Sequence, residues 1–466
     1  MKHTLYQQQQ EQKRWILHPH ARHLKVFDQL LHNEFCDSKQ QIAQYTQRVF
    51  QFIHYAIHAV PYYRDRQSSY TLNSKCFSLD HLTGLPRLEK HEVQTHYTSM
   101  NTQALPSGFK IAGAIKSSGT TGEPVKVLYT ENSLQAFAFY KQREYRSWGL
   151  NPGKSFLSLR PPSDLPLLKG QRLKKGQALK LSAWRYLGGY FNTGSELYLS
   201  DRTPIDLIVE FVETQKPDYL LTMAGTLEHM ALAYSGLGHR SSMAGVLSIS
   251  QQLTDSMRGL AEKHVSANIY QNYGLNEVGL VAMRCPHSNH YHVHNENVVI
   301  EIINQQGQPC QPGEQGKLLV TNVSNPAMPL IRYDTDDFAT VPESPCPCGR
   351  TQQSFIKLRG RYRRTAHLPE GTWEFWDNIV NVFSDAHPED MHPIKQYQLH
   401  QLTADHYHLK LKTTEPVADR LKQQIYRAYK TVYGQRSINL QIKPMAAIDS
   451  PGKKFQNFVS DVVPAE

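Results

Sequence analysis

A run of hydroxyl and glycine residues, Ser117-Ser118-Gly119-Thr120-Thr121-Gly122-Glu123-Pro124, has the composition of a loop that binds phosphate groups. Its glycines allow sharp bends and close approach of the backbone to a ligand. Its four hydroxyls and the N–H groups of the turn offer hydrogen-bond donors to an anion. The segment lacks the Gly-x4-Gly-Lys-Ser/Thr pattern of a Walker A loop. Taken alone it also fits a polar surface turn, since these residues are ordinary loop formers.

Carboxylates follow two later predicted strands. Glu277 belongs to Tyr273-Gly274-Leu275-Asn276-Glu277 and is expected at the end of a strand, where a carboxylate can hold Mg²⁺ beside nucleotide phosphates. Asp337 ends Arg332-Tyr333-Asp334-Thr335-Asp336-Asp337, and a rigidly held carboxylate can accept both hydroxyls of a ribose. Near the C-terminus, Lys453 and Lys454 could neutralise charge between a carboxylate and a phosphate. Each of these segments alone would more often be a solvated turn or tail.

The elements that must position these residues alternate between about 105 and 285. Residues 1–104 are predicted to be a helical lead-in, 286–360 a small β subdomain, and 361–466 a small α+β domain. Alternation of strands and helices predicts a parallel sheet flanked by helices, with ligands at the C-terminal ends of the strands. The expected strands are 125–129, 155–159, 219–223, 246–249 and 267–270, and the expected helices are 134–148, 204–212, 227–234 and 254–264.

The composition limits the classes of protein to which this chain can belong. A chain of 466 residues is too long for one hydrophobic core, and 39% hydrophobic with 20% charged residues fits a soluble globular enzyme. No apolar run approaches the roughly 20 residues of a membrane span, and the polar N-terminus has no signal-peptide core, so we expect a cytoplasmic protein without membrane insertion. The net charge of +10 is dispersed and suits anionic substrates. Because no nucleic-acid-binding motif accompanies this charge, no nucleic-acid partner is expected.

The order and spacing of these segments resemble the adenylate-forming enzymes (the ANL superfamily). Within that superfamily the sequence is most similar to the phenylacetate–CoA ligase and CapK-like branch, over roughly residues 105–460. The resemblance rests on the segments 117–124, 273–277, 328–337 and 346–350, the last being Cys346-Pro347-Cys348-Gly349-Arg350 followed by Gly360-Arg361.

This resemblance implies an α/β fold with a large N-terminal adenylation domain, 1–360, and a small mobile α+β lid, 361–466. It implies that ATP and Mg²⁺ activate a carboxylic acid as an acyl-adenylate with release of pyrophosphate, and that a thiol, by default coenzyme A, then displaces AMP. Glu277 would hold Mg²⁺, and one lysine would act in catalysis: alignment on Phe455 favours Lys454, and alignment on Gly452 favours Lys453. The implied nucleotide-binding residues are Ser117, Ser118, Gly119, Thr120, Thr121, Gly122, Tyr273, Gly274, Asn276, Asp337 and Arg361.

Four of the six cysteines cluster in the last half of the chain. Cys285-Pro286-His287 and Cys346-Pro347-Cys348 offer three thiolates and one imidazole, a set that suits a tetrahedral structural Zn²⁺. The resemblance to this branch, which has a zinc cluster, implies the same ligands. His290, His292 and His294 are competing ligands, and we assign them no role.

The acid would enter beside the Tyr273 loop. Aromatic residues there suit an aryl acid but are equally typical of core packing, so aryl, fatty and amino acids stay open. Three positions depart from the pattern of the family that the sequence resembles. Asn276 stands where Ser or Thr is usual, and Asp334 stands where Arg is usual. Tyr362-Arg363-Arg364 stands where the family has acidic hinge residues. These departures keep two alternatives open: transfer to an acyl carrier protein, an amine or a hydroxyl, and a non-catalytic relative that binds nucleotide. The oligomeric state is open, a homodimer included. The pocket candidates are Trp184, Tyr186, Tyr190, Phe191, Ala224 and Gly225.

Overall fold

The computed structural model describes residues 24–35, 39–70, 72, 77–116, 124–160, 177–359, 365–367, 373–375, 393–433, 439–448 and 458–462. None of the helices in these ranges is long and apolar enough to cross a membrane. The chain divides into two compact units. Unit 1 comprises Met1–Gly153, Ala183–Gly194 and Gln271–Gly360, and unit 2 comprises Lys154–Ser182, Ser195–Tyr270 and Arg361–Glu466. One unit boundary coincides with the domain boundary expected after residue 360, and the rest of that division stays a prediction.

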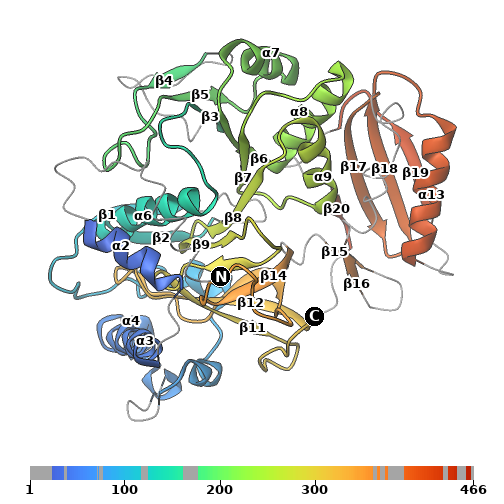
Figure 1. The fold of residues 1–466 in the computed structure, drawn as a ribbon. Helices are drawn as coiled ribbons and strands as arrows, with labels where there is room; N and C mark the ends of the chain where they lie inside the picture. The colour runs from blue at the N-terminus through green and yellow to red at the C-terminus, as the bar shows by residue number, and fades with distance from the viewer. Residues whose placement is uncertain are drawn as a thin grey trace. The chain divides into compact units, whose positions relative to one another are not determined.

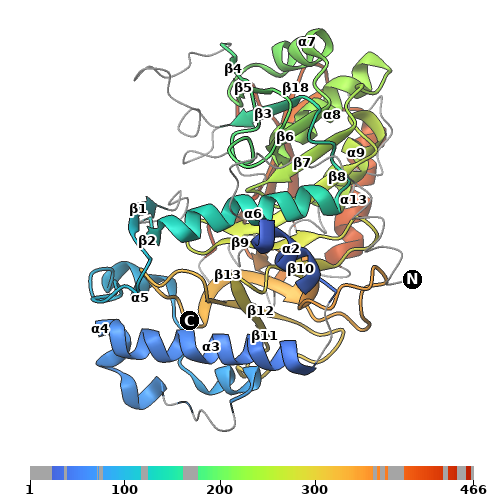
Figure 2. The same ribbon diagram turned by 60° about the vertical axis from the view of Figure 1, so that its left-hand side comes forward.

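Unit 1 begins with helices and continues with α6 (Glu131–Ser147), which packs beside β9 (Gly279–Arg284) (Figure 2). The α6 helix starts where the Thr130 hydroxyl accepts a hydrogen bond from the N–H of Ser133, a standard N-cap. Its middle turns carry buried charges, which shows that α6 lies inside unit 1. The preceding elements are α2 (Leu24–Asn33), α3 (Lys39–Ala59), α4 (Pro61–Arg64), η1 (Gln67–Tyr70), η2 (Leu79–Gly84) and α5 (Lys90–Thr95).

The buried charges of α6 are compensated by ion pairs. The Arg143 guanidinium lies 2.9 Å from Glu296 Oε2 and 3.5 Å from Glu34 Oε1; the side chains of Arg143 and Glu34 are inaccessible to solvent, and that of Glu296 is 12% exposed. Burial alone would raise the pKa of Glu296, but the charge of Arg143 and a hydrogen bond from Asn33 outweigh burial and lower it. These ion pairs therefore hold α6 against its neighbours only while the arginine and its carboxylate partners are all present.

The sheet of unit 1 is antiparallel. Its strands from residue 291 onward lie in the range 286–360, where a small β subdomain was expected, and its strands at 269–275 and 279–284 lie where a parallel sheet was expected. Its order is β8–β9–β10–β14–β13–β12–β11. A separate hairpin pairs β1 (Ile111–Lys116) with β2 (Lys126–Thr130), on either side of the 117–122 segment. The remaining strands are β8 (Ile269–Leu275), β10 (Tyr291–Val293), β11 (Val298–Ile303), β12 (Gln315–Asn322), β13 (Tyr333–Thr340) and β14 (Ser354–Arg359).

Unit 2 contains the parallel sheet that the alternation predicts. The β7, β6, β3 and β5 strands pair in parallel, and β4 adds one antiparallel edge. Their apolar face packs against α7, α8 and α9 through a cluster that includes Leu157, Leu220 and Val246. The elements are β3 (Phe156–Arg160), β4 (Leu179–Leu181), β5 (Glu196–Ser200), α7 (Ile205–Gln215), β6 (Tyr219–Met223), α8 (Ala224–Leu237), β7 (Gly245–Ile249) and α9 (Asp255–His264).

The C-terminal part of unit 2 has the α+β architecture that was expected (Figure 1). Its sheet has the order β19–β18–β17–β20, and α13 (Asp419–Tyr433) packs on it through Leu421, Ile425 and Tyr429. The strands are β15 (Thr365–His367), β16 (Trp373–Phe375), β17 (Ile394–Thr403), β18 (His406–Thr413), β19 (Asn439–Pro444) and β20 (Phe458–Ser460), of which β15 and β16 form a separate hairpin.

Candidate active site and metal cluster

Three of the expected nucleotide-site residues meet in unit 1. The Tyr273 hydroxyl donates a 2.6 Å hydrogen bond to Asp337 Oδ2, which joins β8 to β13. Burial raises the pKa of Tyr273 well above its ordinary value, and the negative charges of Asp337 and, more weakly, Glu277 raise it further. Tyr273, Glu277 and Asp337 are 7%, 5% and 7% exposed. A phenol and two carboxylates from distant parts of the sequence therefore share one buried region.

Glu277 lies just after the C-terminal end of β8, as expected, in the tight turn between β8 and β9. The β8 strand extends through Tyr273 to Leu275, beyond the residues 267–270 expected for it, before the chain reverses. The turn brings backbones close together: a Cβ on Gly274 would lie 3.0 Å from the carbonyl oxygen of Gly279. A side chain at 274 would therefore push the facing strand away, which favours glycine at this position of the hairpin.

A residue that sequence reasoning missed fixes this turn. The Tyr129 hydroxyl, from β2, donates a 2.7 Å hydrogen bond to the carbonyl oxygen of Asn276. Tyr129 is buried, and burial followed by the charge of Glu277 raises its pKa. The strand that leaves the glycine-rich segment is thus tied to the residue before Glu277. The only sequence signal was a tyrosine at an inward position of a predicted strand.

Several expected residues fall outside the described ranges, so their roles stay predictions. The described Lys126, which follows the glycine-rich segment, has its ammonium 4.6 Å from the centroid of the Tyr97 ring, a cation–π contact. Outside the described ranges lie Ser117, Ser118, Gly119, Thr120, Thr121, Gly122, Arg361, Lys453 and Lys454.

Asp334, at a position where the resemblance led us to expect arginine, forms two ion pairs. Its carboxylate lies 3.1 Å from Lys317 Nζ and 3.7 Å from Arg87 Nε, and its side chain is almost fully buried. The departure at this position therefore serves ion pairs beneath the β12–β13 ladder, and Asp337 rather than Asp334 contacts Tyr273.

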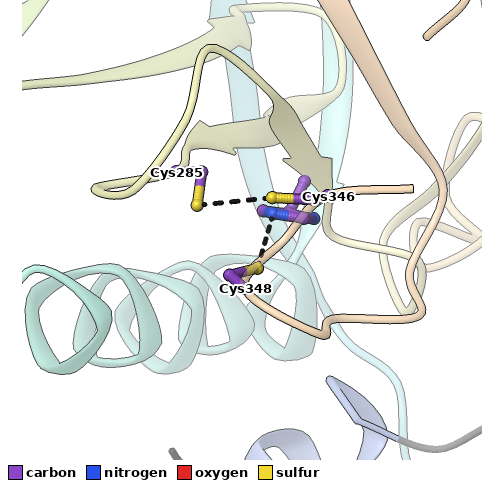
Figure 3. Close-up of side chains that lie close together, drawn as sticks. Cys285, Cys346 and Cys348 are labelled. Atoms are coloured by element: carbon purple, nitrogen blue, oxygen red, sulfur yellow. Dashed lines mark hydrogen bonds between the residues drawn. The ribbon is translucent and has the colours of Figure 1, made fainter. Parts of the chain in front are cut away.

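Cys285, His292, Cys346 and Cys348 form a buried cluster with the composition of a metal site. One ligand atom from each residue lies within 4.8 Å of the others. Cys346 Sγ is 3.7 Å from Cys285 Sγ, and Cys348 Sγ is 3.3 Å from His292 Nε2 (Figure 3). Two thiolates on a tetrahedral zinc ion with bonds of about 2.3 Å are about 3.8 Å apart. The donor set and its spacing therefore fit zinc.

The imidazole of this cluster belongs to His292, which corrects the expectation of His287. The Cys285–His290 hairpin reverses the chain, so that β10 pairs with β9 and brings His292 to the thiols. His287 contributes only its backbone N–H, which donates to Cys285 Sγ at 3.4 Å. Of the other competing histidines, the His290 ring lies 3.1 Å from the Ser344 carbonyl oxygen, and the His294 ring lies 3.1 Å from Glu144 Oε1.

The pKa values of the Cys285 and Cys348 thiols are shifted in opposite directions. Hydrogen bonds from Cys285 and then Cys346 lower the pKa of Cys348. Hydrogen bonding to Cys346 and Cys348, followed by burial, raises the pKa of Cys285. Burial opposes the charged form of His292, but its hydrogen bonds with Cys346 and Cys348 raise its pKa overall. A buried group of thiols of this kind shares protons until a cation replaces them.

The candidate acyl-pocket residues divide between the two units. Three of the four aromatic candidates pack against aromatic side chains of α6 in unit 1, where Trp184 and Phe191 are buried and Tyr186 is 38% exposed. Ala224 and Gly225 lie in unit 2, where the Gly225 N–H donates to Gln251 Oε1 at 3.0 Å. Their role in acid binding stays a prediction. The ring pairs are Phe137–Tyr186 at 5.2 Å, Phe139–Tyr190 at 5.5 Å and Tyr145–Trp184 at 5.7 Å.

Known proteins similar to this chain are coenzyme A ligases. A phenylacetate–coenzyme A ligase from Thermus thermophilus is 25% identical over 392 residues, covering 81% of this chain and 83% of the relative. Another, from Escherichia coli, is 27% identical over 330 residues, covering 68% and 70%. No protein-family model matches the chain.

Solved structures show the same fold. A 2-hydroxyisobutyryl-CoA ligase in complex with 2-HIB-AMP superposes with a TM-score of 0.69 at 14% identity, covering 92% of this chain and 91% of that one. An anthranilate CoA ligase in complex with anthranoyl-AMP gives a TM-score of 0.52 at 14% identity, covering 73% and 65%. The architecture is thus that of the adenylate-forming enzymes. In sequence the chain is similar to phenylacetate–coenzyme A ligases, and in fold it is similar to solved CoA ligases that bind acyl-adenylates.

Proposed function

We propose that the chain is an AMP-forming acid–thiol ligase. It activates a carboxylic acid with ATP as an acyl-adenylate, releases pyrophosphate, and transfers the acyl group to coenzyme A. The observation that carries this proposal is the buried cluster of Tyr273, Glu277 and Asp337, tied to the strand after the glycine-rich segment by Tyr129. The names of the curated relatives support an aryl acid as the first substrate class to test.

Each step has a physical demand that these residues can meet. In the first step an oxygen of the acid attacks the α-phosphorus of ATP, and the bond to pyrophosphate breaks. The repulsion between the two anions is offset by donors at Ser117–Gly122 and by Lys454 or Lys453. Glu277 would hold Mg²⁺, which would neutralise phosphate charge. In the second step the thiolate of coenzyme A attacks the acyl carbon, and AMP leaves.

Binding residues position the nucleotide so that this attack is effectively intramolecular. Asp337 would accept the ribose hydroxyls, and Arg361 would lie nearby. Gly274 and Asn276 would line the same hairpin turn that carries Glu277. We place the reaction in the cytoplasm, because its reducing conditions keep the four described cysteines as thiols.

We further propose that Cys285, His292, Cys346 and Cys348 hold a structural zinc ion. Four protein ligands leave no open coordination position, which separates this site from a catalytic zinc. The ligands come from the β9–β10 hairpin and from the segment before β14, so the ion would join two parts of the same sheet.

The test measures pyrophosphate release from ATP and Mg²⁺ with aryl, fatty and amino acids, with and without coenzyme A. We expect acid-dependent release that is lost in Glu277→Gln and in one of Lys454→Ala and Lys453→Ala. The exposed Glu343→Gln is the matched control and should behave as the wild type. Release that does not respond to coenzyme A would point to a carrier protein, an amine or a hydroxyl as the acceptor. A folded protein that binds AMP but releases no pyrophosphate with any acid would contradict the ligase proposal.

A further inference from the structure

The guanidinium of Arg350 connects the cysteine cluster to the residue that follows α2. Its Nη1 donates to Cys348 Sγ at 3.5 Å, and its Nε donates to Glu34 Oε2 at 3.2 Å. Its Nη2 donates to the Oγ of Ser147, the last residue of α6, at 2.9 Å. The Arg350 side chain is 3% exposed, and that of Glu34 has no exposed surface. One buried cation therefore contacts a sulfur of the cluster, the α6 helix and the end of α2.

Two further contacts join the same parts of the chain. The N–H of Thr351 donates to the carbonyl oxygen of Glu34 at 2.9 Å. The guanidinium carbon of Arg350 lies 5.2 Å from the centroid of the Phe35 ring, a cation–π contact. Residues 34 and 35 are thus held by the two residues at 350 and 351, which follow directly after the expected ligand Cys348.

The charge of a zinc-loaded cluster gives Arg350 a second role. A Zn²⁺ ion with three thiolates and one neutral imidazole carries one net negative charge. Groups that hydrogen-bond to metal ligands orient those ligands and strengthen metal binding. The Arg350 guanidinium can do this at Cys348 while it also compensates the buried carboxylate of Glu34. The position of Arg350 therefore depends on the cluster on one side and on Glu34 on the other.

We propose that Arg350 is a positioning residue of the metal cluster that couples zinc binding to the docking of α2. Docking here means the contacts of residues 24–35 with residues 350–351 and with α6. Zinc fixes Cys348, and with it the guanidinium that holds Glu34. The coupling is reciprocal, so docking of α2 raises the zinc affinity by the factor by which zinc favours docking. The inference rests on the proposed zinc site and extends its effect from the sheet to α2.

Hydrogen exchange of the α2 amides reports docking. The α2 helix has ten residues, and isolated helices shorter than about 12–15 residues are marginal in water, so undocked α2 should exchange rapidly. In the wild type, removal of zinc should speed this exchange on the order of tenfold, the effect of one hydrogen bond to a charged group. Amides of α3, in the same unit, should not respond to zinc and serve as the internal reference.

The experiment measures α2 exchange by mass spectrometry with and without zinc, and zinc affinity with a chromophoric competitor. In Arg350→Gln, α2 should exchange rapidly with or without zinc, the two rates should agree within about threefold, and zinc should bind about 10- to 100-fold more weakly. Glu34 keeps its ion pair with Arg143 in this variant. If Arg350→Gln does not fold, Arg350→Lys takes its place, because one ammonium cannot reproduce the fork of guanidinium donors and should lose the coupling as well.

Asn33→Ala is the matched control. It removes the 2.9 Å hydrogen bond from Asn33 Nδ2 to Glu296 Oε1, a contact of α2 that does not involve the cluster. Exchange of α2 should become faster with and without zinc to the same extent. The effect of zinc on exchange should stay on the order of tenfold, and the zinc affinity should stay that of the wild type.

Each result decides the proposal. An effect of zinc on α2 exchange that is present in the wild type and in Asn33→Ala, and is lost in the Arg350 variant, supports it. A wild type that binds zinc with no change in α2 exchange would overturn it. An effect of zinc that persists in a folded Arg350 variant would also overturn it, since zinc would then act on α2 without the guanidinium. A wild type that binds no zinc would overturn the proposed zinc site itself, and this inference with it.

Discussion

Two histidines of the β9–β10 hairpin provide a direct test of the metal cluster. His292 Nε2 lies 3.3 Å from Cys348 Sγ, whereas His287 reaches the cluster only through its backbone N–H. His292→Ala removes one of four ligands, and His287→Ala removes none. Structural zinc sites bind with about 10–16 kcal/mol, so an equal share for each ligand is about 3 kcal/mol. That share corresponds to a weakening of zinc affinity by about a hundredfold.

The assay strips the metal with a chelator and then titrates zinc against a chromophoric competitor. The wild type and His287→Ala should bind one zinc ion with the same affinity, and His292→Ala should bind it about a hundredfold more weakly. Urea unfolding adds a second readout, because a ligand at about 100 times its dissociation constant stabilises the folded state by about 2.7 kcal/mol. The difference in the free energy of unfolding between the wild type and His292→Ala should vanish when a chelator removes the zinc. What remains is the cost of the cavity that the smaller alanine side chain leaves.

The reasoning fails if His292→Ala retains the zinc affinity of the wild type, or if His287→Ala loses it. It fails equally if the stripped wild type takes up no zinc. His292→Cys guards against a trivial folding defect, because it removes the imidazole but keeps a zinc ligand at the same backbone position. That variant should recover most of the affinity that His292→Ala loses.

Three further substitutions test the packing around the site. Arg143→Met should lower the free energy of unfolding by about 3–5 kcal/mol in a urea titration, because it leaves Glu296 without its cation, whereas Glu34 keeps its ion pair with Arg350. Tyr129→Phe should raise the Mg²⁺ concentration for half-maximal pyrophosphate release by about three- to tenfold, since the Asn276 carbonyl loses its donor; an unchanged Mg²⁺ requirement would remove Tyr129 from the site. Gly316→Ala should cost about 1–3 kcal/mol by overpacking, as its Cβ would collide with backbone and sulfur atoms, whereas Gly259→Ala meets open space and should not destabilise the fold.

The sequence predicted the parts of the fold that local patterns encode. The alternation of strands and helices correctly indicated the parallel sheet of unit 2, and the small α+β C-terminal architecture was also confirmed. The antiparallel pairing of β8 with β9 was not predicted, because the turn between them has strand-like sequence on both sides. The local sequence predicts that a segment forms a strand. Whether the neighbouring strand runs parallel or antiparallel to it depends on long-range packing, which the local sequence does not show.

The candidate site shows the same limit. Local composition identified Tyr273, Glu277 and Asp337 as candidates, but it held no information on which oxygen meets which donor. The choice of His287 over His292 failed because sequence proximity to Cys285 was taken as spatial proximity. In the hairpin, the chain passes the thiols at Cys285, turns, and returns to them at His292. The proximity of His292 to Cys285 follows from the pairing of β9 with β10, which the local sequence does not show.

The register of that pairing also relates the proposed metal cluster to the proposed nucleotide site. His292 pairs across the ladder with Met283, which pairs with Asn272, and the adjacent row joins Val293, Ala282 and Tyr273. Neighbouring strands are separated by about 4.8 Å, so the cluster stands roughly 10 Å from the strand that carries Tyr273. An ion that fixes β10 therefore fixes the strand order on which the Tyr273 hydroxyl depends. Zinc removal should accordingly weaken AMP binding without any metal ligand touching the nucleotide, and full AMP affinity in a folded, zinc-free protein would show that the β8–β10 ladder holds Tyr273 in place unaided.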